Sequence, residues 1–266
     1  MKELATSLAD HYSQGPTLET ISENLQRKGI DLARVRAEDL YPYDQSHAGG
    51  ITTTRMLARL AAIQANSSVV DIGCGIGGAA RFLHAEFGCR VTGIDLTVTR
   101  LRTAVALNRL VGNPAGIYIV AAQADSLPLP SNFADVVWTQ HLTMNLPDPR
   151  GFLRECARVL KPTGRLAFHE WFVNRPDSLP FPLPWAANPS LNFALRAEQF
   201  LELLREQNFS PQYEDVTPAM VDWLQKDIQA LISRNGPAER IAALGNLARA
   251  ATDGLLCCRM VIATRQ

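Results

Sequence analysis

The stretch VVDIGCGIGGAARFLHAEFGCRVTGIDLT, residues 69–97, decides the fold. A short β-branched run ends in glycines, a helical pattern follows, and a second β-branched run begins at Arg90. This order is typical of two parallel strands joined by a right-handed crossover through a helix. Gly73, Gly75 and Gly78 have the G-x-G-x-x-G spacing of a loop that lets a ligand approach the backbone closely. By itself this spacing is a weak signal.

The same alternation continues along the chain. It predicts strands at 68–72, 90–94, 117–121, 134–139 and 164–170, with helices at 77–87, 97–111 and 149–160. The fold class is therefore α/β, a doubly wound Rossmann-like sheet. Later patterns predict helices at 196–207, 218–233 and 237–250, a strand near 211–217 and a last strand at 254–265.

Two segments stand outside this alternation. Residues 172–195 hold five prolines with interleaved aromatics, and so long an irregular stretch in a compact domain usually has a function. Helices at 2–11 and 17–28 and the polar loop YPYDQSHAGG (41–50) precede the core. We therefore expect residues 1–50 to form a helical lid with a cofactor-covering loop. Residues 51–266 would form the core, with an acceptor-side insertion at 172–195.

Composition excludes several classes of protein. Lys and Arg number 26 against 26 Asp and Glu, without a basic run, so a nucleic-acid partner is not expected. The apolar stretches are too short to predict a membrane span or a signal peptide, which favours a cytoplasmic protein. The five cysteines lack CxxC spacing, so neither a metal nor a disulfide is expected. Adjacent Cys257 and Cys258 should point to opposite faces of a strand.

Three acidic residues follow three successive strands and suggest the ligand. Asp71 beside the glycine loop would repel a pyrophosphate but attract an ammonium, which S-adenosylmethionine carries. Asp95 lies where an acidic side chain can accept from both ribose hydroxyls, and Asp125, with Ser126 beside it, lies where it can reach the adenine. The alternatives are a helix cap for Asp95 and a turn aspartate for Asp125.

These motifs, together with ADSLPLPSNFADVVWTQHLTMNLPD (124–148) and RVLKPTGRLAFHEW (158–171), resemble the class I S-adenosylmethionine-dependent methyltransferases. The pattern is similar to sarcosine/dimethylglycine N-methyltransferases and to quinone and tocopherol methyltransferases. The resemblance implies a seven-stranded sheet with its last strand antiparallel and S-adenosylmethionine as cofactor. It implies cofactor contacts from Gln45, Gly49, Asp71, Gly73, Cys74, Gly75, Asp95, Leu96, Ala124, Asp125, Ser126 and Gln140.

The acceptor should lie beyond strand 134–139. His141 at its end is the predicted general base and His47 a second candidate, with structural loop histidines as the alternative. His169 and Glu170 end the next strand, and alternation sends only one of them toward a given face. The predicted acceptor contacts are Tyr43, Met144, Asn145, His169, Glu170 and Trp185.

The sequence thus predicts an enzyme that methylates a small molecule, with an amine or small natural product as the favoured acceptor. Oxygen or carbon of a phenol, quinol or prenylated acceptor is an alternative, and a non-catalytic cofactor-binding domain is another. A nicotinamide-dependent oxidoreductase shares the glycine spacing, but Asp71 and the lack of a Tyr-x-x-x-Lys pair disfavour it. The chain is expected to be a monomer or a homodimer.

Overall fold

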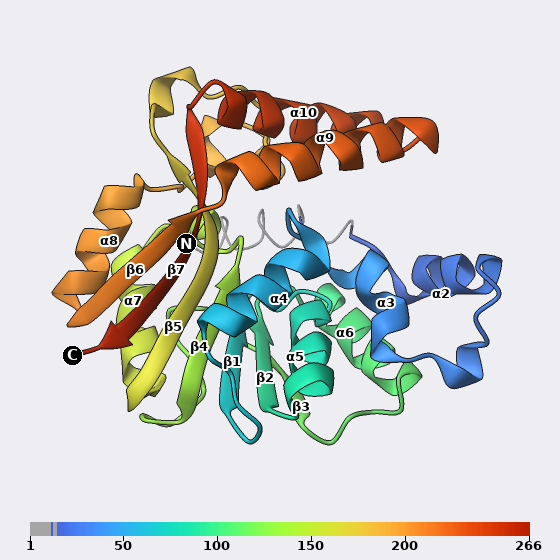
Figure 1. Ribbon diagram of the computed structural model, residues 1–266, viewed down its shortest axis with the longest axis horizontal. Helices are drawn as coiled ribbons and strands as arrows, with labels where there is room; N and C mark the ends of the chain where they lie inside the picture. The colour runs from blue at the N-terminus through green and yellow to red at the C-terminus, as the bar shows by residue number, and fades with distance from the viewer. Residues whose placement is uncertain (1–11, 13–14) are drawn as a thin grey trace.

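The computed structural model describes Tyr12 and residues 15–266, so the helix predicted at 2–11 lies outside the described residues. Seven strands form one sheet in the order β3-β2-β1-β4-β5-β7-β6 (Figure 1). Among them only β7 runs antiparallel to its neighbours β5 and β6. The predicted doubly wound sheet with an antiparallel last strand is confirmed. The strands are β1 (Ser68–Ile72), β2 (Arg90–Asp95), β3 (Ile117–Ala121), β4 (Ala134–Gln140), β5 (Leu160–Val173), β6 (Phe209–Asp215) and β7 (Leu256–Arg265).

Helices cover both faces of the sheet, which explains why β1 and β4 are buried over almost their whole length. On one face α4 and α5 pack Leu57 and Phe82 against the strands. On the other face α7 and α8 contribute Phe152 and Phe200. The helices are α2 (Leu18–Arg27), α3 (Ala37–Asp44), α4 (Gly50–Leu60), α5 (Gly78–Phe87), α6 (Val98–Leu110), α7 (Pro149–Val159), α8 (Ala197–Glu206), α9 (Thr217–Ser233) and α10 (Ala238–Thr252).

The structure corrects two local predictions. Part of the predicted polar loop, up to Asp44, belongs to helix α3, which buries Leu40 and carries Pro42 inside it. An internal proline and two tyrosines hid so short a helix from a periodicity search. Strand β5 is also longer than predicted, because it begins at Leu160 and passes an irregularity opposite β4 before the regular pairing.

Helices α9 and α10 form an antiparallel pair above the carboxyl end of the sheet (Figure 1). The irregular insertion contacts this pair, because Asn246 on α10 donates to the carbonyl of Pro182. Within the described part of the chain, no helix is long and apolar enough to cross a membrane. The helix pair and the insertion lie on the carboxyl side of the sheet, the side on which the aspartates also lie (Figure 1).

A fully buried ion pair fixes α3 to the core. The guanidinium of Arg81 on α5 donates to Asp44 at 3.0 Å, and both side chains are fully inaccessible to solvent. Arg81 also donates to Asn108 on α6 and to the carbonyl of Ile76 in the glycine loop. Because these bonds replace hydration of the buried charges, losing one partner leaves the other uncompensated.

We predict that Arg81→Met destabilises the fold by about 3 to 5 kcal/mol, because it strands the buried Asp44 carboxylate. Urea denaturation measures this loss. The matched control is Arg102→Met on the exposed face of α6, which should change the unfolding free energy by less than about 0.5 kcal/mol. Equal effects of the two substitutions would show that the ion pair contributes no special stability.

Candidate cofactor and acceptor site

A cavity of about 280 Å³ opens at the carboxyl ends of β1, β2 and β4, the edge at which open α/β sheets bind ligands. It collects nine of the twelve predicted cofactor residues from four separate segments of the chain. They are Asp71, Gly73, Cys74, Gly75, Asp95, Leu96, Ala124, Asp125 and Gln140.

At two positions of the loop, neighbouring atoms come so close to the backbone that only glycine fits. Gly75 has a φ of +54°, and a Cβ there would collide with the guanidinium of Arg100. Gly78 begins α5, and a Cβ there would overlap the carbonyl oxygen of Asp44. The third glycine of the motif thus lets the N-terminal segment dock on the loop.

Asp71 is a buried carboxylate without a full set of partners. Its Oδ2 has no hydrogen-bond partner among the described residues, although the side chain lines the cavity. Burial, with a smaller contribution from the neighbouring Asp95, raises the pKa of Asp71 to about 7. A buried carboxylate oxygen facing a cavity calls for a cationic donor from a ligand.

Asp95 is not the N-cap of α6, which is Thr97, but its carboxylate binds two backbone N–H groups and also lines the cavity. One carboxylate oxygen accepts from the backbone N–H of Gly75 at 2.8 Å, and the other accepts from that of Thr97 at 2.8 Å. The first bond closes the glycine loop on β2, and the second orders the start of α6. Each oxygen keeps a lone pair for a hydroxyl donor.

The remaining predicted cofactor residues lie at the margin or outside the cavity. Asp125 is exposed at its rim, while Ser126 does not line it and donates its N–H to Gln123. Gln45 links α3 and α4 by donating to Asp44 and accepting from Thr54. Gly49 caps α4 with a φ of +83°. Gln45 and Gly49 therefore shape the loop around His47 from outside the cavity wall.

The two histidines proposed as bases do line the cavity, with ring centroids 5.8 Å apart. His141 has a φ of +56°, and its Nε2 is buried without a partner among the described residues. His47 bonds through Nε2 to the hydroxyl of Thr54 at 3.0 Å. Burial lowers the pKa of His47 to about 4 and that of His141 well below its usual value. Both imidazoles are therefore neutral near pH 7, as a proton acceptor must be.

His169 and Glu170 lie behind the cavity wall and are both fully buried. The carboxylate of Glu170 accepts from the backbone N–H groups of Leu142 and Thr143 and from two threonine hydroxyls. It thereby holds the turn that follows His141. These bonds give Glu170 a positioning role in place of the predicted direct contact with an acceptor.

Of the other predicted acceptor residues, Met144, Asn145 and Trp185 line the cavity, whereas Tyr43 does not. Tyr43 packs instead in the small core around α2 and α3, with the ammonium of Lys28 4.9 Å from its ring centre. The indole N–H of Trp185 donates to Asn192 at 2.9 Å, which fixes the ring inside the insertion. The insertion thus contributes one aromatic wall.

Sequence reasoning missed two residues of the wall. The hydroxyl of Tyr12 donates to Asn145, and the guanidinium of Arg100 lies 5.6 Å from the Tyr12 ring centre. Both residues line the cavity. Arg100 belongs to an ordinary helical pattern and Tyr12 precedes the core, so only the three-dimensional fold reveals their role.

The raised pKa of Asp71 makes stability depend on pH. Between about pH 4 and pH 7 the folded chain holds a proton on Asp71 that the unfolded chain has released. The contribution of Asp71 to the free energy of unfolding therefore falls as the pH rises. We predict that the free energy of unfolding of Asp71→Asn rises relative to that of the wild type as the pH increases. The difference between the two proteins should grow by on the order of 3 kcal/mol from about pH 4 to pH 8. Denaturation of both ligand-free proteins across this range measures the gain. A difference that does not change with pH would contradict the account of Asp71.

The comparisons with known proteins agree with this geometry. Residues 70–168 match the model of a family described as a methyltransferase domain. The 2-methyl-6-phytyl-1,4-hydroquinone methyltransferase of Synechocystis is 34% identical over 46% of this chain and 37% of its own length. The sarcosine/dimethylglycine N-methyltransferase of Halorhodospira halochloris is 32% identical over 44% of this chain and 42% of its own. The chain thus spans about two fifths of these curated relatives.

Solved structures extend the likeness to the whole chain. The geranyl diphosphate C-methyltransferase of Streptomyces coelicolor superposes with a TM-score of 0.75 at 16% identity, covering 99% of this chain and 98% of that one. At this identity the match shows the fold alone. The predicted resemblance is confirmed: residues 70–168 match a methyltransferase-domain family, and the chain shares the Rossmann-like fold of a solved methyltransferase.

Proposed function

We propose that this chain binds S-adenosylmethionine in the cavity at the carboxyl edge of the sheet and transfers its methyl group to a small molecule. The buried, unpartnered Oδ2 of Asp71 is the observation that carries the proposal. A carboxylate held out of water is costly unless a ligand supplies a donor. The ammonium of the cofactor's methionine moiety supplies both a donor and a positive charge.

The rest of the wall fits the other parts of this cofactor. The free lone pairs of Asp95 suit ribose hydroxyls, and Asp125 at the rim suits an adenine amino group. Gly75 lets the backbone approach the ligand. A pyrophosphate would meet Asp71 and Asp95 at the glycine loop, so the same wall disfavours a dinucleotide.

The protein's contribution to the reaction is alignment and proton handling. The bound cofactor supplies an electrophilic methyl group on a sulfonium whose charge disappears as the methyl leaves. Met144 and Trp185 shape the acceptor side, which orients the attacking atom. An acceptor nitrogen or oxygen that must lose a proton can pass it to neutral His141, whose ring lies at the cavity wall.

An amine or small natural product is the acceptor class that we favour. Neutral imidazoles beside an aromatic wall suit a polar nitrogen that loses a proton during transfer. The related N-methyltransferase of Halorhodospira acts, by its name, on sarcosine and dimethylglycine. A phenol, quinol or prenylated acceptor is the alternative, favoured by the apolar side chains of Leu142, Met144 and Pro184 in the same wall. The cytoplasmic location and a monomeric or homodimeric state remain predictions.

Calorimetric titration of the protein tests the cofactor. S-adenosylmethionine and S-adenosylhomocysteine should bind with micromolar affinity and NADH should not. Asp71→Asn should weaken binding roughly 10- to 100-fold, because a charge-assisted hydrogen bond is lost. Wild-type affinity should also fall as the pH drops below about 7, where Asp71 takes up a proton, and this dependence should vanish in the variant.

Asp253→Asn is the matched control, because Asp253 is an exposed carboxylate outside the cavity lining. This variant should bind S-adenosylmethionine like the wild type. Binding of NADH alone would favour an oxidoreductase. Tight cofactor binding without methyl transfer to amines, phenols, quinols or prenyl diphosphates would favour the non-catalytic domain. Failure of both cofactor ligands to bind would refute the proposal.

A further inference from the structure

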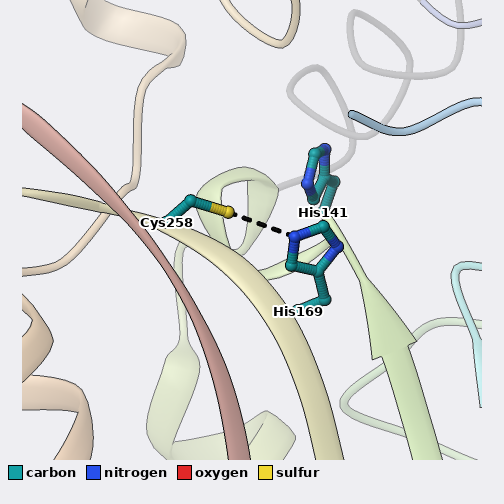
Figure 2. Close-up of side chains that lie close together, drawn as sticks. All are labelled: His141, His169 and Cys258. Carbon is teal, nitrogen blue, oxygen red and sulfur yellow. Dashed lines mark hydrogen bonds between the residues drawn. The ribbon is translucent and has the colours of Figure 1, made fainter. Parts of the chain in front are cut away.

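Three potential metal ligands from distant parts of the chain meet behind the cavity wall. His141 follows β4, His169 lies on β5 and Cys258 lies on β7 (Figure 2). One ring nitrogen of each histidine and the Sγ of Cys258 all lie within 4.8 Å of one another. The spacing of these three residues along the chain does not predict this group, because it is not that of a metal motif.

The sheet itself fixes this meeting. Gln140 pairs with His169 across β4 and β5, and the backbone N–H of His141 donates to the carbonyl of His169 at 2.8 Å. The antiparallel register of β5 and β7 brings Cys258 opposite Trp171, two positions beyond His169. Figure 2 shows the Sγ of Cys258 pointing at the His169 ring, with Nε2 at 3.2 Å.

The two imidazoles have unused nitrogen atoms. His141 Nε2 is buried and has no hydrogen-bond partner among the residues that the structure describes. His169 faces Cys258 with its Nε2, so its own unpartnered nitrogen, Nδ1, is not the one that would bind the ion. The His141 and His169 rings lie 4.8 Å apart between centroids. His47 stands nearby, but Thr54 and the carbonyl of Ala48 engage its two nitrogens. The group with coordination capacity is therefore His141, His169 and Cys258.

We propose that His141, His169 and Cys258 bind one Zn²⁺-like transition-metal ion. A thiolate with two neutral imidazoles is a donor set that suits zinc and its neighbours and does not suit Mg²⁺ or Ca²⁺. Three protein ligands are the number found at catalytic zinc sites, which keep one position for water. His141 also lines the main cavity, so that open position faces the proposed acceptor.

The present geometry is close to the tetrahedral one. With bonds of about 2.0 Å to nitrogen and 2.3 Å to sulfur, neighbouring ligand atoms of a tetrahedral zinc lie roughly 3.3–3.6 Å apart. The Cys258–His169 edge, at 3.2 Å, is already near this value. The longest separation, at most 4.8 Å, has to shrink by about 1.3 Å. His141 lies beyond the strand end, where rotation of its side chain can supply this movement.

The surroundings suit a cation. On binding, Cys258 releases its proton to solvent, so a divalent ion with one thiolate and two neutral histidines retains one positive charge. Glu170, next to His169, is a buried acidic side chain that can balance this charge. Its bonds to the N–H groups of Leu142 and Thr143 also hold the turn that carries His141. Such supporting contacts orient the ligands of metal sites.

The site goes beyond the proposed methyl transfer and does not rest on it. If both proposals hold, His141 would be a metal ligand in the loaded protein, and a hydroxide formed when metal-bound water releases its proton to solvent would accept the proton of the substrate. The pKa of a zinc-bound water is lowered to about 7, which suits that task.

Cobalt substitution of tag-free, chelator-treated full-length protein tests the site. Co²⁺ should bind at one ion per chain and give a thiolate-to-cobalt charge-transfer band with the intense visible bands of four-coordinate cobalt. Zn²⁺ should displace it. Cys258→Ser should abolish the charge-transfer band and weaken Co²⁺ binding at least 10-fold, and His141→Ala should weaken binding while keeping the band.

Cys257→Ser is the matched control, because Cys257 points to the other face of β7, toward Asn174, and should leave the spectrum unchanged. Thermal melting of each variant establishes that it is folded, and S-adenosylhomocysteine binding of the wild type is measured separately. No charge-transfer band in the wild type would overturn the metal site, and so would a band that survives in folded Cys258→Ser. Cofactor binding without cobalt binding would refute this inference and leave the proposed function standing.

Discussion

A carboxylate buried at the end of β1 without a full set of partners is the constraint on which the site depends. Folding removes Asp71 from water, and the wall around it supplies backbone curvature and a second carboxylate, Asp95, but no donor to its Oδ2 among the described residues. Such a group costs stability in the free protein. A cationic ligand that donates to Asp71 Oδ2 would offset this cost. The proposed cofactor and the fold are therefore linked through this carboxylate oxygen.

The other buried charges show how the same fold treats groups that serve the structure. Arg81 and Asp44 satisfy each other, and Glu170 is surrounded by four donors. The first pair docks α3 and the loop with His47 onto the glycine turn. Glu170 fixes the turn with His141. The segments with His47 and His141 are therefore held by charged groups that have hydrogen-bond partners, whereas Asp71 between them lacks a full set.

The sequence predicted the sheet and most of the residues that line the cavity at its edge, because both depend on local patterns. β-branched runs, glycine spacing and residues that directly follow strands are visible without knowing any long-range contact, as for Asp71 and Asp95. Helix α3 was not predicted because Pro42 interrupts the helical spacing of its apolar residues. Glu170 was predicted to contact the acceptor. The alternation of side chains along a strand indicates the face on which a residue lies, but it does not identify the hydrogen-bond partners that Glu170 finds there. Tyr12, Arg100 and the approach of Cys258 to His169 depend on tertiary packing and strand register, which the residue pattern does not contain.

A crystal structure of the protein with S-adenosylhomocysteine tests the central claim most directly. The account predicts the ligand's ammonium within hydrogen-bond distance of Asp71 Oδ2, its ribose hydroxyls at Asp95, and its sulfur directed toward the space between His141, Met144 and Trp185. A ligand bound elsewhere, or bound in this cavity with its ammonium away from Asp71, would contradict it.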